Sequence, residues 1–311
     1  MEPTVLVYAS HDRSNLIHND WIVQRALRGS RRILFLPLST PSADDDEMRH
    51  QRAAWESFNW FFRYYAPYGL NAFPFFWHSG LQRADVDLLW SALGTADVVI
   101  LGGGYPALGM SRFAELGRRF YDDPDRFRRM MHERQAAGLL TAGFSAGADQ
   151  LCELMSSESG PGQRTAGLGV ARDVIATSHF EPGQEPWLRT LAATFPSCLL
   201  FGLPNDSALA VAEGETARGA WWQVIHMVVD LSWDRPEDGF HIKTRQGVPI
   251  QHFYPDGRHW AFRGGDRLVR VRPASREADE IWILAPNAPV RDYATGEPSA
   301  FDSLEAILAA K

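Results

Sequence analysis

A single serine lies between two glycines in the segment GFSAG, residues 143–147. An apolar run, 139–144, comes before Ser145, and a helical pattern follows it. A G-x-S-x-G sequence at a strand-to-helix turn is typical of a nucleophile elbow, a sharp turn that holds the serine hydroxyl above the end of a sheet. Its glycines let the strand and the helix approach without Cβ clashes. The pattern therefore predicts that Ser145 attacks a carbonyl carbon.

Two other uses of this glycine-rich turn stay open. Such turns also occur without any chemistry, and some bind phosphate. The phosphate interpretation is the weaker one, because the segment lacks the Lys-Ser/Thr ending of a P-loop. The glycines of GGGYPALG, 102–109, also lack the spacing of a dinucleotide-binding turn. The apolar run before Ser145 and the helical pattern after it favour the nucleophile elbow.

A nucleophilic serine needs a base for its proton and N–H donors for the oxyanion. The N–H of Ala146 lies at the N-terminus of a predicted helix, where the helix dipole favours negative charge. The loop LGGGYP, 101–106, follows another predicted strand and is the natural source of a second donor, which we assign to Gly104. His179 follows an apolar run toward the same edge of the predicted sheet. It is the favoured base among the ten histidines.

Strand and helix patterns alternate along the first half of the chain. The strand patterns are 4–10, 31–39, 71–77, 97–104 and 139–145, and the longest helical pattern is 42–69. Such alternation is typical of a parallel sheet covered by helices on both faces. We expect an α/β catalytic domain over 1–215. Short strands with Asp-Gly and Gly-Gly turns predict a smaller β-rich extension over 216–311, packed on that domain.

The composition excludes several classes of protein. The chain has 311 residues and a net charge of −7, which disfavours nucleic-acid or anionic-membrane partners. Its first residues lack the pattern of a signal peptide, and no apolar run approaches the roughly 20 residues of a membrane span. Two cysteines do not make a disulfide framework or a Cys-rich metal site. We expect a cytoplasmic protein that needs no metal and no cofactor.

Four segments carry a resemblance to a known family. They are ADVVILGGG (96–104), TAGFSAGA (141–148), the His-Phe pair at 179–180, and GLPNDSALAV (202–211). With them the chain resembles the cyanophycinase and aspartyl dipeptidase (peptidase E) family of serine peptidases over roughly residues 4 to 213. The resemblance implies a flavodoxin-like three-layer sandwich with a mostly parallel central sheet, of the class I glutamine amidotransferase-like type. It also implies hydrolysis of an amide bond in a small peptide or amide.

The resemblance also assigns a catalytic triad. It implies Ser145 as the nucleophile, His179 as the base, and an acid between them in the sequence, for which Glu158 lies nearest to the expected position. Glu181 is the competitor, because related amidotransferases place the acid two residues after the histidine. We favour Glu158. A carboxylate in either place would hold Nδ1–H of the imidazole and stabilise the imidazolium.

Two residues depart from the family pattern where substrate contacts are expected. Tyr105 follows the glycines in place of a small polar residue, and Asn205 stands where the family commonly has glutamate. We expect both residues to bind substrate, and the family's substrate preference does not transfer. The GGGYP sequence is reminiscent of the cobyrinic-acid amidotransferase branch. That branch uses a cysteine nucleophile, so the serine at 145 argues against glutamine-dependent transfer.

The expected function is therefore hydrolysis through a Ser-His-Glu triad and an acyl-enzyme. The first alternative is a binding or regulatory module that kept the fold and lost the reaction, as the two departures suggest. The second is an esterase of the α/β-hydrolase type, which expects its base well downstream of the serine. The histidines that fit this second alternative are His226, His241, His252 and His259. By analogy with the family we also expect a homodimer.

Overall fold

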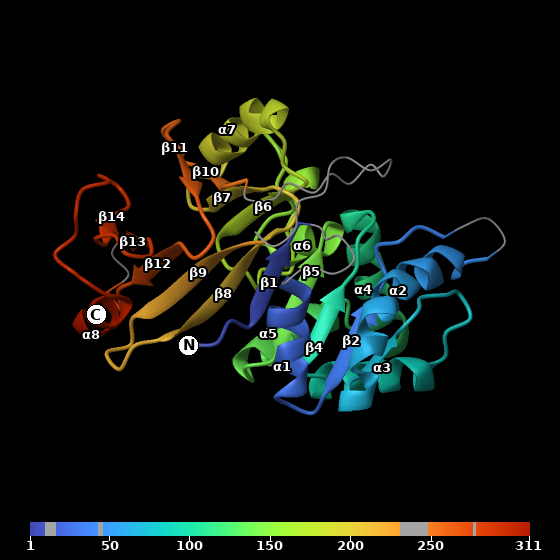
Figure 1. Cartoon of the computed structure of the whole chain (residues 1–311). Helices are drawn as coiled ribbons and strands as arrows, with labels where there is room; N and C mark the ends of the chain where they lie inside the picture. The colour runs from blue at the N-terminus through green and yellow to red at the C-terminus, as the bar shows by residue number, and fades with distance from the viewer. Residues whose placement is uncertain (10–16, 43–45, 231–247, 276–277) are drawn as a thin grey trace.

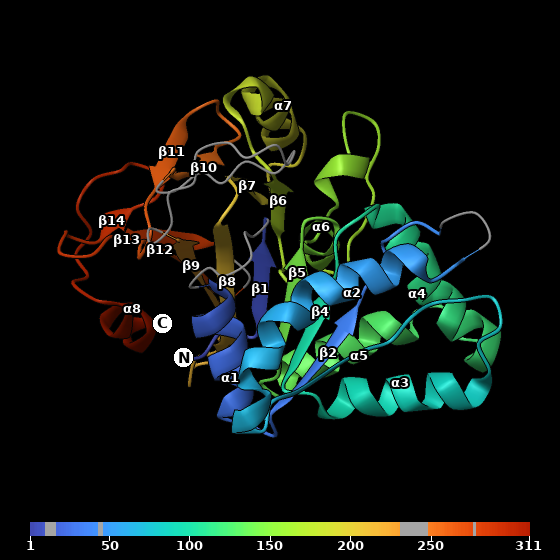
Figure 2. The ribbon, with the colours of Figure 1, turned by 45° about the vertical axis from the view of Figure 1, so that its right-hand side comes forward.

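The computed structural model describes residues 1–9, 17–42, 46–230, 248–275 and 278–311. Its strands form one ten-stranded sheet of order β14-β13-β12-β9-β8-β1-β5-β4-β2-β3 and one four-stranded sheet of order β11-β10-β7-β6. Figures 1 and 2 show the large sheet running through the molecule, with the smaller sheet above its centre.

Five neighbouring strands of the large sheet run parallel. They are β1 (Val5–Tyr8), β5 (Leu140–Phe144), β4 (Val98–Leu101), β2 (Arg32–Leu36) and β3 (Asn71–Pro74). The first four are apolar and almost completely buried, as expected for strands that are covered on both faces. Since the strands are parallel, their carboxyl ends lie at one edge of the sheet, and Ser145 follows β5 at that edge.

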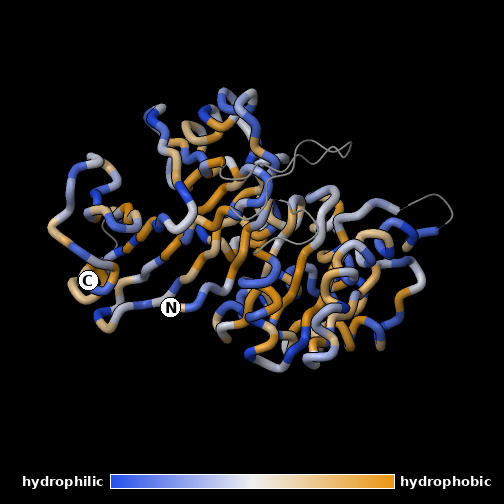
Figure 3. Tube along the Cα trace, in the orientation of Figure 1, coloured by the Kyte–Doolittle hydropathy of each residue, from blue (hydrophilic) through white to orange (hydrophobic). Residues whose placement is uncertain are grey.

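Helices cover both faces of this parallel half. On one face lie α3 (Arg83–Thr95), α4 (Pro106–Tyr121), α5 (Arg126–Ala136) and α6 (Ala146–Leu151). On the other face lie α1 (Gln24–Leu27), the π-helical turn His18–Val23 before it, and α2 (Arg49–Phe62). Figure 3 shows hydrophobic residues concentrated along the strands between these layers.

The longest predicted helix is shorter in the structure than the sequence predicts. The pattern at 42–69 predicts one long helix, but α2 begins at Arg49, and residues 43–45 of the predicted first turn lie outside the described residues. After Phe62 the chain continues as a 3-10 helix, Arg63–Tyr68, which ends at Gly69 with φ of 84°. The aromatic side chains of Phe58 and Phe62 on α2 pack on the sheet and are buried.

The rest of the large sheet is antiparallel. It consists of β8 (Ser207–Glu215), β9 (Trp221–Val229), β12 (Arg267–Arg272), β13 (Glu280–Leu284) and β14 (Arg291–Asp292), and α8 (Leu304–Ala310) packs against it. The predicted mostly parallel, flavodoxin-like sandwich is therefore wrong. The ten-stranded sheet has four parallel pairings and five antiparallel ones. The reason is that β8 pairs antiparallel with β1 and the later strands extend the same sheet.

The smaller sheet brings distant parts of the chain together. It contains β6 (Val174–Ser178), β7 (Leu199–Leu203), β10 (Ile250–Phe253) and β11 (His259–Phe262), and α7 (Glu185–Thr194) packs on it. The described part of the segment 216–311 is rich in strands. It contributes β9 and β12 to the large sheet and β10 to the small one, so it shares both sheets with the segment 1–215.

Within the described ranges, no helix has both the length and the apolar character required to cross a membrane.

Candidate active site

Ser145 has a strained backbone at the turn between β5 and α6. Its φ is 50° and its ψ is −109°, a conformation that costs a non-glycine residue of the order of 1–3 kcal/mol. Its N–H donates to the carbonyl of Tyr8 (3.0 Å), and its carbonyl accepts from the N–H of Asp149 (3.1 Å). The turn is thus tied to β1 on one side and to the first turn of α6 on the other. A serine with this backbone at a strand-to-helix turn fits the geometry of a nucleophile elbow.

The glycines on either side of Ser145 allow a close contact between the strands and the helix. A Cβ on Gly143 would lie 2.2 Å from the carbonyl oxygen of Gly147, and a Cβ on Gly147 would lie 2.2 Å from that of Leu101. Contacts this short with backbone atoms require the backbone to shift. The two glycines are therefore needed for packing, and their presence follows from the position of α6 against β4 and β5.

We predict that Gly147→Ala destabilises the protein, because the added methyl group meets the backbone of β4. The free energy of unfolding should fall by about 2 kcal/mol or more. Gly94→Ala is the matched control, since a Cβ on Gly94 has no neighbour within 4 Å and alanine favours a helix. Urea unfolding of both variants measures the difference. Equal stability of the two variants would contradict the packing argument.

A hydrogen-bonded chain of three side chains begins at Ser145. Its Oγ lies 2.8 Å from Nε2 of His179, and Nδ1 of His179 lies 2.8 Å from Oδ1 of Asn205. Because an amide oxygen only accepts, Nδ1 must carry the imidazole proton, which leaves Nε2 to accept the serine hydroxyl proton. His179 itself has a φ of 57°, directly after β6. The arrangement has the order nucleophile, base and orienting group.

Neither of the two predicted acids occupies the position at Nδ1. Asn205 lies there, although the sequence analysis assigned it to substrate and gave this position to Glu158. Within the described residues, the hydrogen bonds of Glu158 are made by its main chain. Its N–H donates to the carbonyl of Met155, and its carbonyl accepts from the hydroxyl of Thr165. The exposed Glu181 begins the 3-10 turn Pro182–Gln184, where its side chain accepts from the N–H of Gln184.

Asn205 reaches His179 because their strands are neighbours. The strands β6 and β7 pair in parallel, with Ser178 opposite Leu203, and the N–H of Phe180 donates to the carbonyl of Leu203 (2.9 Å). His179 and Asn205 therefore follow two adjacent parallel strands at the same edge. In the sequence, Asn205 follows an apolar run, 198–204, just as His179 follows an apolar run. This shared pattern is the signal that could have placed Asn205 at the same edge as His179.

Donors for an oxyanion border Ser145 from two segments. Ala146 is the first residue of α6, where the N–H groups have no partner within the helix. The glycine loop after β4 approaches from the other side, and a Cβ on Gly103 would lie 3.5 Å from Cβ and 4.0 Å from Oγ of Ser145. Gly104, the predicted donor, is the next residue and has a φ of 131°. Tyr105 follows as the N-cap of α4, with an exposed side chain.

The glycine loop is held in place by the loop after β2. A Cβ on Gly104 would lie 2.1 Å from the carbonyl oxygen of Ser39, which accepts a hydrogen bond from Tyr105 N–H (2.8 Å). Fully buried Gln150 of α6 donates from Nε2 to Oγ of Ser39 (2.9 Å) and to the carbonyl of Pro106 (2.8 Å). The side chain of Gln150 thus connects α6 to the loop after β2 and to the start of α4, which follows the glycine loop.

We predict that Gln150→Met slows the reaction of Ser145, since methionine keeps the length of the side chain and loses its donor. A shift of about 1 Å at a reacting group can cost about 100-fold in rate, so we expect kcat to fall about tenfold or more, with a smaller change in KM. Gln135→Met, which removes a hydrogen bond to the carbonyl of Val170, is the matched control. An equal loss of kcat in both variants would show a general effect on the fold.

A buried carboxylate shapes the segment that contains Glu158. Asp149 accepts hydrogen bonds from the N–H groups of Ser156 (2.5 Å) and Ser157 (3.3 Å) and from the Ser157 hydroxyl. Burial raises the pKa of the Asp149 carboxyl, and the hydrogen bonds from Ser157 and Ser156 act against that shift. These bonds fix the 3-10 turn Ser156–Glu158. The role of Asp149 is to position this turn.

Two of the other histidines proposed as bases, His252 and His226, are buried or half-buried away from Ser145. Buried His252 bridges the carbonyl of Leu200 (2.8 Å) and the hydroxyl of Tyr293 (2.6 Å), and burial lowers its pKa to about 4. His226 lies on β9, which is separated from β5 by β8 and β1, and burial lowers its pKa to about 4 as well. His259 is exposed on β11, and His241 lies outside the described residues.

Comparison with known proteins adds no family to this description. No protein-family model matches the chain, and no curated protein matches it significantly. The function is therefore argued from the geometry around Ser145.

Proposed function

We propose that this protein is a serine hydrolase that cleaves an acyl bond, with an amide of a small peptide as the expected substrate. The observation that carries the proposal is the continuous hydrogen-bonded chain from Ser145 through His179 to Asn205. A strained elbow and N–H donors on two sides of the serine support it. The resemblance to the cyanophycinase and peptidase E family, which rests on motifs around Ser145 and His179, points to the same reaction.

The proposed reaction has two steps. In the first, Oγ of Ser145 forms a bond to the carbonyl carbon while its proton moves to Nε2 of His179. The N–H groups of Ala146 and Gly104 hold the oxyanion, each contributing about 3 kcal/mol by comparison with known oxyanion holes. The tetrahedral intermediate then expels the amine, which takes the proton from Nε2. In the second step water attacks the acyl carbon while its proton moves to Nε2 of His179. The bond from that carbon to Oγ then breaks, and Oγ of Ser145 takes the proton from Nε2 as the acid product leaves.

Asn205 defines how this site differs from a Ser-His-acid triad. Its amide oxygen fixes the tautomer of His179, because it accepts from Nδ1 and leaves Nε2 free to act as a base. Its neutral side chain supplies no charge to stabilise the imidazolium. We therefore propose that the third group acts through orientation, and that turnover is slower than a carboxylate at the same place would allow.

The neutral residue at this position also favours a second candidate function. A binding or regulatory protein that lost the reaction would tolerate the loss of the carboxylate. Such a protein would bind its ligand equally well after Ser145→Ala. A hydrolase would bind substrate after this substitution and lose turnover, so turnover distinguishes the two functions.

The proposal is tested with a panel of dipeptides, isopeptides, simple amides and their matching esters, assayed with the wild type and with Ser145→Ala. Hydrolysis by the wild type that disappears in the variant supports the proposal. If both proteins hydrolyse a substrate at the same rate, or if neither hydrolyses any ester or amide, the proposal fails. The cytoplasmic location, the homodimer and the absence of nucleic-acid and membrane partners stay predictions from composition and analogy.

A further inference from the structure

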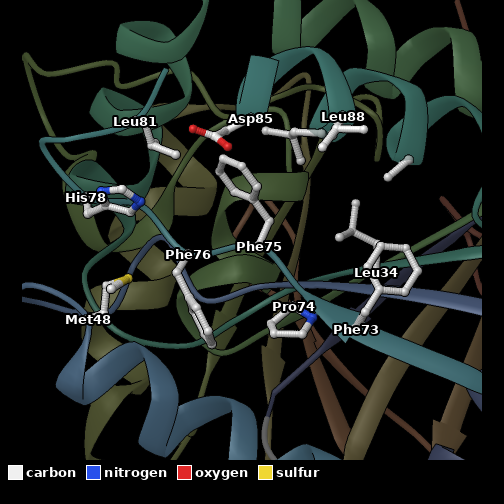
Figure 4. A pocket seen from close by; sticks show the side chains of 12 residues that line it. Leu34, Met48, Phe73, Pro74, Phe75, Phe76, His78, Leu81, Asp85 and Leu88 are labelled. Atoms are coloured by element: carbon white, nitrogen blue, oxygen red, sulfur yellow. The ribbon is translucent and has the colours of Figure 1, made fainter. Parts of the chain in front are cut away.

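An apolar cavity lies at the outer edge of the parallel half, away from Ser145. Its volume is about 330 Å³, within the range of roughly 300–1,000 Å³ that is usual for small-molecule sites. It lies between the edge strand β3 and α3 (Figure 4). Three strand positions separate β3 from β5, or about 14 Å at the usual spacing, so the cavity is distinct from the catalytic chain.

The walls of the cavity carry an unusual density of aromatic rings. Phe73, Phe75 and Phe76 line it, and all three side chains are only partly buried. Leu89 of α3 closes the side toward the core. Aromatic side chains on an edge strand normally gain stability by complete burial. Here they leave a concave apolar surface that a flat ligand can cover.

Hydrogen bonds to neighbouring segments hold the wall after β3 in place. Fully buried Gln51 of α2 donates to the carbonyl of Trp77 (2.7 Å) and accepts from its N–H (2.9 Å). Further along, Ser79 donates its N–H to Glu47 (2.7 Å), and its carbonyl accepts from Arg119 of α4 (3.0 Å). Residues of α2 and α4 thus fix Trp77 and Ser79 of this wall through hydrogen bonds. The cavity is preorganised, because its wall cannot collapse without breaking these bonds.

The polar groups of the cavity lie at one end. Figure 4 shows the carboxylate of Asp85 above the ring of Phe75, and His78 lies on the same side of the cavity. Asp85 accepts one hydrogen bond through Oδ2, from the N–H of Gln82 (2.9 Å). A carboxylate next to aromatic faces attracts an ammonium group, by charge and by the cation–π interaction. The rest of the cavity suits an aromatic ring.

We propose that this cavity is a binding site for a small aromatic amine, with the ring against Phe73 and Phe75 and the ammonium group at Asp85. Its volume fits one ring with a short side chain. The site does not depend on Ser145, so its existence is independent of the proposed hydrolysis.

The test uses three probes of similar size: phenethylamine, 2-phenylethanol and phenylacetate, which carry a positive charge, no charge and a negative charge. Their binding is measured by calorimetry and by chemical-shift changes in the full-length wild type. We expect phenethylamine to bind with a Kd in the range of about 1 mM or below, at least about tenfold more tightly than phenylacetate. Ser145→Ala should bind it equally well.

Three further variants locate the probe. Asp85→Asn keeps the hydrogen bond to Gln82 and should abolish the preference for the amine. Asp87→Asn removes the same charge from the same helix, but Asp87 accepts a hydrogen bond from the hydroxyl of Tyr121. This variant should retain the preference for the amine. Ala92→Phe fills the cavity and should weaken binding of all three probes. If Ala92→Phe does not fold, the two aspartate variants still decide the result.

Three outcomes would overturn this site. They are no binding of any probe at about 10 mM, equal binding of the amine and the carboxylate, and equal effects of Asp85→Asn and Asp87→Asn.

Discussion

His179→Ala should reduce kcat/KM by about 10⁴-fold or more once a substrate is in hand. Removal of the base from a serine triad leaves the hydroxyl without a proton acceptor, and such substitutions cost up to about 10⁶-fold in known cases. His179 is only partly buried, so its loss should change stability much less than activity. The comparison of kcat/KM with the midpoint of urea unfolding separates the two effects.

His259→Ala is the matched control for this substitution. His259 is exposed on β11 and is one of the bases that an α/β-hydrolase-type esterase would allow. The geometry predicts that its removal leaves kcat/KM unchanged. A large loss of activity in His259→Ala, with activity retained in His179→Ala, would contradict the role of His179 and favour the esterase hypothesis.

The second large effect concerns Asn205. Asn205→Leu keeps a similar volume and removes the acceptor at Nδ1, so His179 can rotate or adopt the tautomer that cannot accept the proton of Ser145. We expect kcat to fall by about 10²- to 10⁴-fold, the range that an incorrect tautomer causes in a triad. Asn205→Asp should retain activity or raise it. A carboxylate there favours the imidazolium, so the acidic limb of the pH–rate profile should move to higher pH.

Glu158→Gln completes this experiment. It removes the carboxylate that the sequence suggested as the triad acid, and the geometry predicts less than about a threefold change in kcat, as for a surface substitution away from the reacting groups. If Glu158→Gln abolishes turnover while Asn205→Leu does not, the assignment of the third group to Asn205 is wrong. The pH–rate profiles of all three variants provide a second readout of the same assignment.

Ser145 and His179 were predictable because their signals are local. The elbow requires an apolar strand, two glycines and a helix within about 15 residues, and each of these follows from sequence periodicity and steric limits. The parallel half of the sheet was predictable for the same reason. Its strands are short, apolar runs that alternate with helices, and the glycine loop at 102–104 follows one of them.

Asn205 was placed wrongly because its role depends on strand pairing. The family resemblance favoured Glu158, because it implies an acid between Ser145 and His179 in the sequence. In the folded chain the parallel pairing of β6 with β7 puts Asn205 beside His179, and no local pattern specifies that pairing.

The sheet was predicted wrongly for a related reason. Alternating patterns after residue 207 indicate strands, but they do not say whether those strands form a separate layer or extend the first sheet. The pairing of β8 with β1 decides this, and it makes the sheet mixed.

The most direct test of the proposed reaction is covalent labelling of the native wild-type protein with a fluorophosphonate probe, followed by intact mass and peptide mapping. We predict one adduct per chain, on Oγ of Ser145 with loss of fluoride, no adduct in Ser145→Ala, and much slower labelling in His179→Ala. A folded wild type that never reacts, or an adduct that persists in Ser145→Ala, would contradict the account of Ser145 as an activated nucleophile.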